Sequence, residues 1–441
     1  MDLFDPLFSS PAVQQLFGSR TQVQFLLNYE AALAKAEAAA GLIPVAAAES
    51  IVAHCRVELF DLEALAKATR LAGNPVIPLV KALTLLVGVT DASAARYVHW
   101  GATSQDVMDT ALVLQVRQVL DLAIGELDRL AQSLTALVEQ HRGTVMIART
   151  LLQHAQPTSF GLKAAGWLVA VRRAIARIAH LRQRALVLQF GGASGTLSGL
   201  GDAGLRVSED LAARLDLSLP DLPWHTERDH LAEVGTMLGL LAGTLGKIAK
   251  DLSLLMQTEV AEAAESTRPG QGGSSAMPHK QNSVGCAVVI AASLRAPGLV
   301  ATLLSAMGHE HERALGAWHA EWETLPELCR LVVGALGHLN QICASLRINT
   351  ARMAANLELT SDLVYAADLA GALASALGAD SHAVVEELCR EARVRGKSLQ
   401  KVAAQDPRVV AALTREQLRE VFTTTHHLAA ANRLIDRALR Q

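Results

Sequence analysis

The spacing of apolar residues between positions 109 and 142 predicts one long helix. Asp109 is suited to begin this helix as its N-cap, and Gly143 is suited to end it. Its apolar positions recur at alternating steps of four and three, the heptad spacing of a helix packed along its whole length in a bundle. These positions are Val116, Leu120, Ala123, Leu127, Leu130, Leu134 and Leu137.

Similar patterns cover most of the remaining chain and predict an all-α fold. An earlier helix at 20–40 ends at Gly41, and the tail from about 351 holds shorter helices, one opened by the capping-box pattern Thr414 to Gln417. No stretch predicts a convincing strand. Four more long helices are expected at roughly 159–188, 227–264, 284–307 and 323–347, giving five in the middle of the chain. We therefore expect an N-terminal helical domain, a central five-helix bundle and a C-terminal helical domain, at 1–108, 109–350 and 351–441.

Composition supports this fold class and narrows the possible partners. Of the 441 residues, 51% are hydrophobic but only 4% are aromatic, and alanine and leucine dominate. Lys plus Arg number 40 against 43 Asp plus Glu, without clusters, so no nucleic-acid partner is expected. The five cysteines lack CxxC pairs, which argues against a disulfide framework or a zinc site.

The distribution of apolar segments predicts a cytoplasmic protein with no membrane partner. The first residues, "MDLFDPLF", lack the basic region and apolar run of a secretory signal. The most apolar later stretch, 287–307, carries Arg295 and Pro297 and is expected to fall short of a membrane span.

Two polar stretches flank the predicted long helix and carry candidate chemistry. The first, "HWGATSQD", places Thr103, Ser104 and Gln105 near a helix N-terminus, where N–H groups favour an anion. A simple capping turn is the alternative. The second, "RTLLQHAQPTSFG", brings Gln153 and His154 to another helix entrance. A lone histidine among small residues is more often a structural group than a catalyst, so that alternative stays open.

The third polar stretch, "GQGGSSAMPHKQNSVGC" at 270–286, interrupts two apolar helical segments. Its glycines allow close approach of the backbone to a ligand, and Ser274, Lys280 and Asn282 offer a hydroxyl, a charge and an amide. It does not fit the nucleotide-binding P-loop pattern. A flexible surface linker is the alternative, but a linker has no use for a lysine and an asparagine held two residues apart.

The segment "GSSAMPHKQN", Gly273 to Asn282, resembles the signature of the fumarase, aspartase and adenylosuccinate lyase superfamily. The first two polar stretches resemble its other two active-site regions, in the same order. Within the superfamily, the chain looks most like the bacterial 3-carboxy-cis,cis-muconate cycloisomerases. The segments that carry this similarity are "LVLQFGGASGTL", "PWHTERD", "LLMQTEV" and "HERALGAWHAEWETLPEL", at 186–197, 223–229, 254–260 and 311–328. Ser283, Gln281 and Leu152 depart from the residues usual at those places: proline, a basic residue and an aromatic.

The resemblance implies a cofactor-independent, metal-independent enzyme that lactonises a tricarboxylate diene in aromatic-acid breakdown. It implies that Ser274 handles the carbon-bound proton, and that His154 and Lys280 assist at the same site. The substrate-binding residues that it implies are Thr103, Ser104, Gln153, Asn282, Arg228 and Arg313. For Arg228 and Arg313, which would hold the additional carboxylate, a surface charge without a role is the alternative. Two other functions are weighed: a fumarate-releasing lyase of the adenylosuccinate type, and a non-catalytic helical scaffold.

The length of the first bundle helix also predicts that the active site is shared between subunits. A helix from about 110 to 142 is roughly 50 Å long at ~1.5 Å per residue. It separates Thr103 from His154 along the chain, and no small substrate spans that distance. If both residues serve one site, they come from different chains. The resemblance agrees, because the superfamily builds each site from three subunits of a homotetramer.

Overall fold

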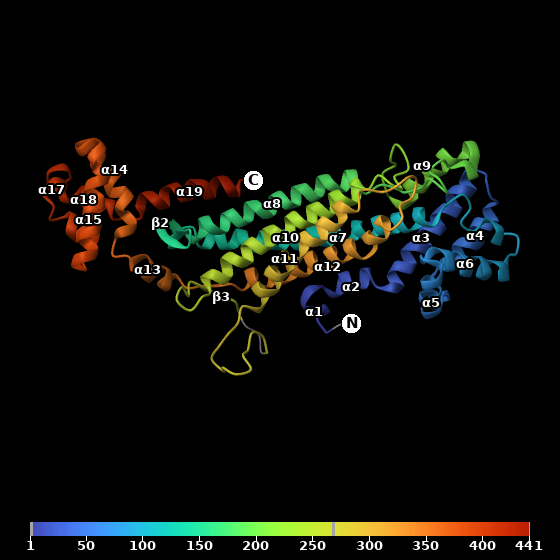
Figure 1. Ribbon diagram of the computed structural model, residues 1–441, viewed down its shortest axis with the longest axis horizontal. Helices are drawn as coiled ribbons and strands as arrows, with labels where there is room; N and C mark the ends of the chain where they lie inside the picture. Colours follow the sequence, from blue (N-terminus) through green and yellow to red (C-terminus); the bar gives the residue numbers. More distant parts are fainter. Residues whose placement is uncertain (1–2, 267–269, 441) are drawn as a thin grey trace. The chain divides into compact units, whose positions relative to one another are not determined.

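The computed structural model describes residues 3–266 and 270–440, and it is largely helical (Figure 1). The long helices are α3 (Ser19–Ala39), α7 (Ser104–Gln140), α8 (Phe160–Ala185), α10 (Asp229–Leu255), α11 (Val284–Ser305) and α12 (Ala317–Ala344). The shorter helices before α12 are α1 (Asp5–Phe8), α2 (Pro11–Leu16), α4 (Val45–His54), α5 (Leu62–Ala72), α6 (Val76–Thr90) and α9 (Gly204–Leu215). The tail forms α13 (Thr350–Glu358), α14 (Ala366–Leu377), α15 (Ser381–Arg395), α16 (Leu399–Ala403), α17 (Pro407–Ala412), α18 (Arg415–Val421) and α19 (Thr425–Leu439). The prediction of an all-α fold with five long helices in the middle of the chain is therefore confirmed.

The long helix α7 begins earlier than the sequence analysis predicted. Its first residue is Ser104, and Asp109, the expected N-cap, lies inside the helix and is buried. The N-terminal turn is capped by Asp106, whose Oδ2 accepts a hydrogen bond from the Thr103 N–H at 3.0 Å. The predicted heptad is correct, because all seven of its apolar side chains are buried. They lie at Val116, Leu120, Ala123, Leu127, Leu130, Leu134 and Leu137.

The expectation that the chain lacks strands is wrong for residues 145–159. Strands β1 (Val145–Thr150) and β2 (Gln153–Ser159) form an antiparallel hairpin. A two-residue turn joins them, with Leu151 and Leu152 both at positive φ, 51° and 63°. Such a turn normally uses asparagine or glycine, so two leucines gave no hairpin signal in the sequence. A smaller pair, β3 (Ala263–Ala264) with β4 (Arg347–Ile348), also forms.

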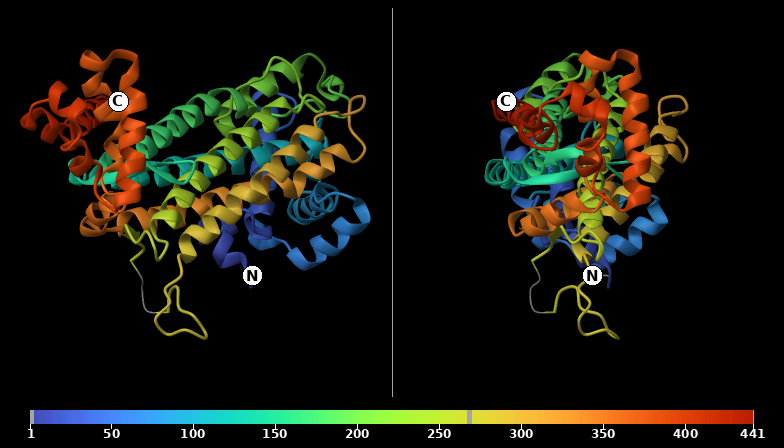
Figure 2. Two further views of the ribbon diagram at one scale, coloured as in Figure 1. Left: turned by 60° about the vertical axis from the view of Figure 1, so that its left-hand side comes forward. Right: turned by 90° about the vertical axis from the view of Figure 1, so that its left-hand side faces the viewer.

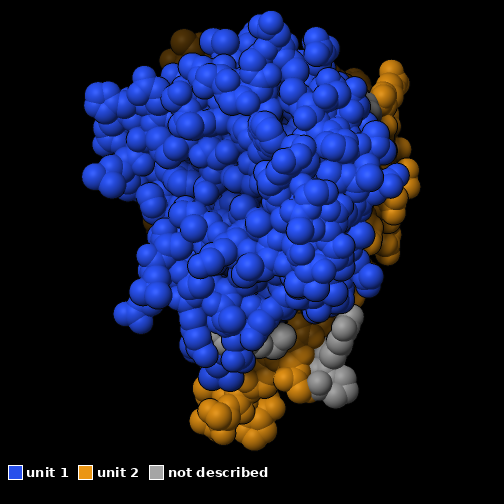
Figure 3. All heavy atoms as spheres, turned by 90° about the vertical axis from the view of Figure 1, so that its right-hand side faces the viewer, with its two compact units in different colours: residues 1–128, 173–247, 287–339 blue, residues 129–172, 248–286, 340–441 orange. Residues whose placement is uncertain are grey.

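The contacts within the chain divide it into two compact units (Figure 3). Unit 1 comprises residues 1–128, 173–247 and 287–339, and unit 2 comprises 129–172, 248–286 and 340–441. In unit 1, α3 packs against both α4 and α9, which lie far apart in the sequence. The division into three domains at 108 and 350 stays a prediction.

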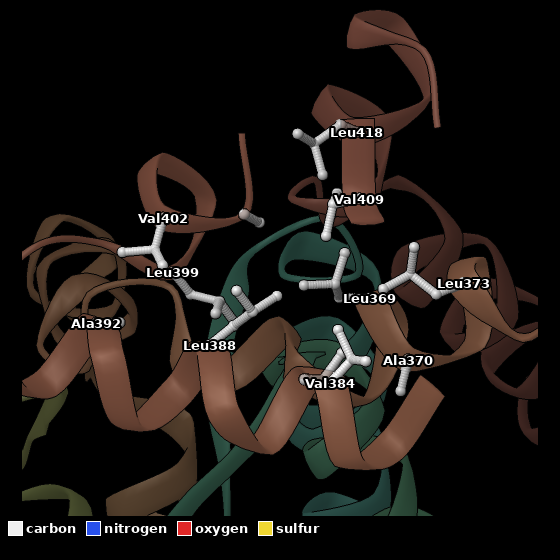
Figure 4. Packing of buried hydrophobic residues seen from close by; sticks show 12 residues of the cluster. Leu369, Ala370, Leu373, Val384, Leu388, Ala392, Leu399, Val402, Val409 and Leu418 are labelled. Atoms are coloured by element: carbon white, nitrogen blue, oxygen red, sulfur yellow. The ribbon is translucent and has the colours of Figure 1, made fainter. Parts of the chain in front are cut away.

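The C-terminal part of unit 2, orange to red in Figure 2, is a helical cluster with its own apolar core. Figure 4 shows leucine and valine side chains from α14 to α18 meeting in this core. Leu388 of α15 and Leu369 of α14 are fully buried there. The capping box predicted at Thr414 and Gln417 is present and begins α18.

Three helical stretches are long and apolar enough to cross a membrane by length and composition alone: Asp229–Leu255, Val284–Ser305 and Leu363–Arg395. The expectation that the 287–307 stretch falls short of a span is therefore wrong on these two criteria. Within the chain, α11 contacts α12, since Arg295 pairs with Glu327 at 2.5 Å. Only 28% of the most apolar 18-residue segment of α11 is buried inside the chain.

We predict that Leu388→Ala destabilises the protein by about 2–5 kcal/mol, because it leaves a cavity in the C-terminal core. Val394→Ala in the same helix is the matched control, since Val394 is 83% exposed and its truncation should change stability by less than about 0.5 kcal/mol. Urea unfolding followed by circular dichroism measures both. Equal effects of the two substitutions would contradict the packing described here.

Candidate functional site

The carboxylate of Asp106 organises the first polar stretch within unit 1. It is fully buried and accepts hydrogen bonds from Gly191 N at 3.0 Å, Gly192 N at 2.9 Å and His225 Nε2 at 2.7 Å, besides capping Thr103. A buried carboxylate is stable only when its oxygens are paired in this way. Asp106 therefore holds the backbone beside Thr103 against the segments 186–197 and 223–229, which both carry the resemblance.

One turn further along α7, Asp109 forms a buried ion-pair triad with Arg228 and Glu321. Arg228 NH1 and NH2 donate to Asp109 at 2.7 and 2.9 Å, and its Nε and NH2 donate to Glu321 at 3.0 and 2.5 Å. The carbonyl of Trp224 accepts another NH1 bond at 3.4 Å, and Trp318 Nε1 donates to Asp109 at 3.0 Å. All five N–H donors of the guanidinium are thereby used.

Burial and charge shift the pKa values in this triad in definite directions. Burial lowers the pKa of Arg228, but Asp109 and Glu321 outweigh it, and the net shift is upward. Burial raises the pKa of the Glu321 carboxyl more than the hydrogen bond from Arg228 lowers it. Burial and the Arg228 charge lower the pKa of His309, whose Nε2 lies 3.5 Å from Glu321. Arg228 therefore stays charged, and His309 is the neutral partner.

This geometry changes the role that we assign to Arg228. The surface-charge alternative is wrong, because the residue is only 2% exposed. Binding a substrate carboxylate would require breaking one of the bonds to Asp109 or Glu321. We therefore assign Arg228 a structural role, which the prediction at the end of this section tests.

Arg313 is placed differently, and it lies next to the first polar stretch. Its Nε donates to Gln105 Oε1 at 3.0 Å, and its NH2 donates to the carbonyl of Ala193 at 3.2 Å. Gln105 in turn donates to the His225 carbonyl at 2.8 Å. Arg313 is exposed, and its contact with Gln105 places it next to the stretch that holds Thr103 and Ser104.

His99 opens the first stretch and is a residue whose role the sequence analysis missed. Its Nδ1 lies 2.7 Å from Oε1 of Glu30, a buried side chain of α3, and its backbone has a positive φ of 62°. Burial lowers the pKa of His99, but Glu30 outweighs it, and the net shift is upward. This pair holds the start of the first polar stretch against α3. A glutamate in the middle of an apolar helix is the signal that could have revealed it.

In unit 2, the second polar stretch is the β1–β2 hairpin. Arg149 binds Glu262 in a bidentate pair at 2.7 and 2.9 Å, and Asn356 Nδ2 donates to the same carboxylate at 2.8 Å. His154 pairs with Arg149 across the hairpin. Burial and the Arg149 charge lower the pKa of His154, against an opposing effect of Glu262. The imidazole is therefore neutral near pH 7, and its buried Nδ1 has no hydrogen-bond partner among the described residues.

The third stretch is a loop of unit 2 that directly precedes α11 along the chain (Figure 1). Its neck is closed by Asn282, whose N and Nδ2 donate to the Gly272 carbonyl at 2.8 and 3.2 Å. A Cβ at Gly272 would approach the Asn282 carbonyl to 2.7 Å, so the glycine is required. Ser274 Oγ accepts a hydrogen bond from Met277 N at 3.1 Å, and Lys280 is exposed.

The structure thus brings some of the predicted site residues together and leaves others apart. In unit 1, Arg313 lies beside the stretch that holds Thr103 and Ser104. Among the described residues of unit 2, no hydrogen bond or ion pair joins Gln153 or His154 to the loop residues Ser274, Lys280 and Asn282. The assignment of these residues to one site stays a prediction.

Comparison with known proteins places this arrangement in a family. Residues 8–298 match a family model described as "Lyase". The chain belongs to this lyase family, the fumarase and aspartase superfamily. The resemblance predicted from the polar stretches is therefore confirmed.

Individual members of the lyase family match the whole chain. A 3-carboxy-cis,cis-muconate cycloisomerase of Pseudomonas aeruginosa is 50% identical over 440 residues, covering 100% of this chain and 96% of its own length. A nitrosuccinate lyase of Streptomyces davaonensis is 42% identical over 446 residues, covering 99% of this chain and 94% of its own. The crystal structure of the 3-carboxy-cis,cis-muconate lactonizing enzyme from Pseudomonas putida superposes with a TM-score of 0.94 at 47% identity, covering 99% of this chain and 98% of that chain.

We predict that Arg228→Met destabilises the protein by about 3–5 kcal/mol, because it leaves two buried carboxylates without their cation. The loss should grow as pH rises. Without the guanidinium, the pKa of the Glu321 carboxyl, which burial already raises, rises further above its unfolded value, so the folded state binds more protons than the unfolded state. Urea unfolding near neutral pH and at about pH 5 measures the effect.

Arg313→Met is the control, since it removes an exposed arginine and should leave stability nearly unchanged. A stable Arg228→Met protein whose only defect is a raised KM would contradict the structural role and restore Arg228 to the substrate-binding residues.

Proposed function

We propose that the protein is a 3-carboxy-cis,cis-muconate cycloisomerase. The observation that carries this proposal is the 50% identity to such an enzyme over the whole chain. Ser274, Lys280 and Asn282 are all present in the loop that corresponds to the superfamily signature. The reaction adds one carboxylate of the substrate across a carbon–carbon double bond of the same molecule, which closes a lactone ring.

The chemistry of lactonisation explains which groups the site must supply. As the new carbon–oxygen bond forms, the π electrons of the double bond move to the neighbouring carbon and spread into its carboxylate. Donors aimed at that carboxylate stabilise the charge, and a proton is then delivered to the carbon. We assign the donors to Lys280, Asn282 and the hydroxyls of Thr103 and Ser104, and the proton transfer to Ser274.

The electrostatics of His154 suit a binding role. The attacking group is a carboxylate that is already ionised, so no base is needed to activate it. In the reverse direction the leaving group is also a carboxylate, which needs little protonation. A neutral imidazole, as the lowered pKa of His154 gives, can hydrogen-bond the substrate without transferring a proton. We therefore propose that His154, with Gln153 beside it, orients the substrate, and that Arg313 holds the additional carboxylate.

We also propose that the protein assembles as a homotetramer in the cytoplasm. Helix α11 is the most apolar long helix, yet only 28% of its apolar window is buried within one chain. Packing against the same helix of other chains would remove this surface from water. The 37-residue helix α7, about 55 Å long, lies between Thr103 and His154 along the chain. This length supports a site assembled from several chains.

A fumarate-releasing lyase is the second candidate, and the similarity to a nitrosuccinate lyase favours it. Incubation of the purified protein with 3-carboxy-cis,cis-muconate should cause loss of the conjugated-diene absorbance and formation of a carboxymuconolactone. Parallel incubations with nitrosuccinate and adenylosuccinate should release no fumarate. Fumarate release without lactone formation would replace the cycloisomerase proposal with the lyase.

We predict that Ser274→Ala lowers kcat by about 100-fold or more, because it removes the group that transfers the proton to carbon. The helical circular-dichroism signal and the assembly state should not change, since the loop contributes little to the core. Ser275→Ala is the matched control, because the two serines are adjacent in the same loop. Near-wild-type turnover of Ser274→Ala would remove Ser274 from the mechanism.

A further inference from the structure

Helices α19 and α14 both belong to unit 2 (Figure 1). Two consecutive histidines at the start of α19 face one carboxylate of α14. His426 Nε2 lies 3.2 Å from Oδ1 of Asp368, and His427 Nε2 lies 3.1 Å from Oδ2. Asp368 and His427 are largely buried, with 15% and 13% of their side chains exposed, and His426 is half exposed. The two imidazole rings lie 3.9 Å apart.

The spacing of these three groups suits a divalent metal ion. Their candidate ligand atoms all lie within 4.8 Å of one another. In a tetrahedral zinc site with bonds of 2.0–2.2 Å, neighbouring ligand atoms are about 3.3–3.5 Å apart. The two nitrogen–oxygen distances are close to that value. In the absence of a metal, both imidazoles would have to carry a proton on Nε2 and donate it in a hydrogen bond to the same carboxylate.

A second carboxylate lines the same surface hollow as two of these groups. Glu420 and Gln417 of α18 line the same surface hollow as Asp368 and His426. Two neutral imidazoles and two carboxylates balance the charge of a divalent cation. Glu420 thus offers a fourth ligand from the same hollow. Water completes the coordination if the Glu420 carboxylate does not reach the ion.

We propose that Asp368, His426 and His427 bind one Zn²⁺ ion, with Glu420 as the additional oxygen ligand. Imidazole with carboxylate is a donor set that favours zinc over the oxygen-preferring ions magnesium and calcium. The expectation of no metal came from the cysteine pattern and from the family resemblance, and neither bears on Asp368, which is far from the two histidines along the chain. The proposal is independent of the cycloisomerase activity.

Such an ion would fasten the first turn of α19 to the first turn of α14. The other end of α19 is already held within unit 2, because Asp436 pairs with Arg142, and the carbonyl of Ala438 accepts a 2.6 Å hydrogen bond from Arg172. Zinc would therefore fix both ends of the final helix. Its binding should slow amide hydrogen exchange in the first turns of α19.

The test is a zinc titration of the chelator-treated, full-length protein by equilibrium dialysis. We expect one Zn²⁺ per chain, no competition from Mg²⁺, and an affinity that falls about tenfold or more in His427→Gln and in Asp368→Asn. His382→Ala is the matched control, since His382 is an exposed histidine of the same helical cluster, in α15, and its loss should not change binding. Bound Co²⁺ should give the intense visible bands of a low-coordinate site, and the same two variants should lose them.

Three results would overturn the proposal: no stoichiometric zinc binding, equal affinity in the wild-type protein and both variants, or an equal loss in His382→Ala. His427→Gln and Asp368→Asn keep a polar side chain of similar size, and thermal unfolding of the zinc-free proteins checks that they fold. A variant that melts like the wild-type protein but binds zinc unchanged excludes its residue as a ligand.

Discussion

Buried charge in the first turns of α7 is the constraint on which the organisation of unit 1 depends. Asp106 and Asp109 are removed from water, and each is stable only because its oxygens are fully paired. Their partners come from three distant segments: the glycines at 191 and 192, the stretch around His225 and Arg228, and Trp318 of α12. The carboxylates therefore determine where the loops around Thr103 lie. Arg313 lies at the edge of this network, where it donates to Gln105 and to the Ala193 carbonyl, and we propose that its charge meets a substrate carboxylate there.

The length of the helices is the second constraint, and it determines how the chain can build a catalytic site. After Gln115, α7 buries only apolar side chains among the described residues until it ends at Gln140. Polar chemistry is consequently confined to the ends of the long helices and to the hairpin and loop that follow them. We propose that such a chain gains a complete site by association, and the poorly buried α11 offers an apolar surface for it. Stability and catalysis would then depend on the same contacts between chains.

The sequence predicted the helices and the polar stretches well, because both have local signals. The heptad of α7 is a periodic pattern, and the signature from Gly273 to Asn282 is a contiguous motif. The hairpin at 145–159 was not predicted, because its turn uses Leu151 and Leu152 at positive φ in place of asparagine or glycine. The partners of Arg228 and His99 were not predicted from the sequence for another reason. Asp109, Glu321 and Glu30 are distant in sequence, and only the packed helices bring them together.

The most direct test of a shared lactonising site mixes two inactive variants, His154→Ala and Ser274→Ala, after partial denaturation and renaturation. We expect mixed tetramers to regain activity on 3-carboxy-cis,cis-muconate. About a quarter of the sites should recover if the chains assort at random and the two residues come from different chains. Each variant renatured alone, and a protein carrying both substitutions, should stay inactive. Mixed tetramers that form, as native mass spectrometry would show, but have no activity would contradict the shared site for this pair of residues, and a protein that is monomeric in solution would contradict it altogether.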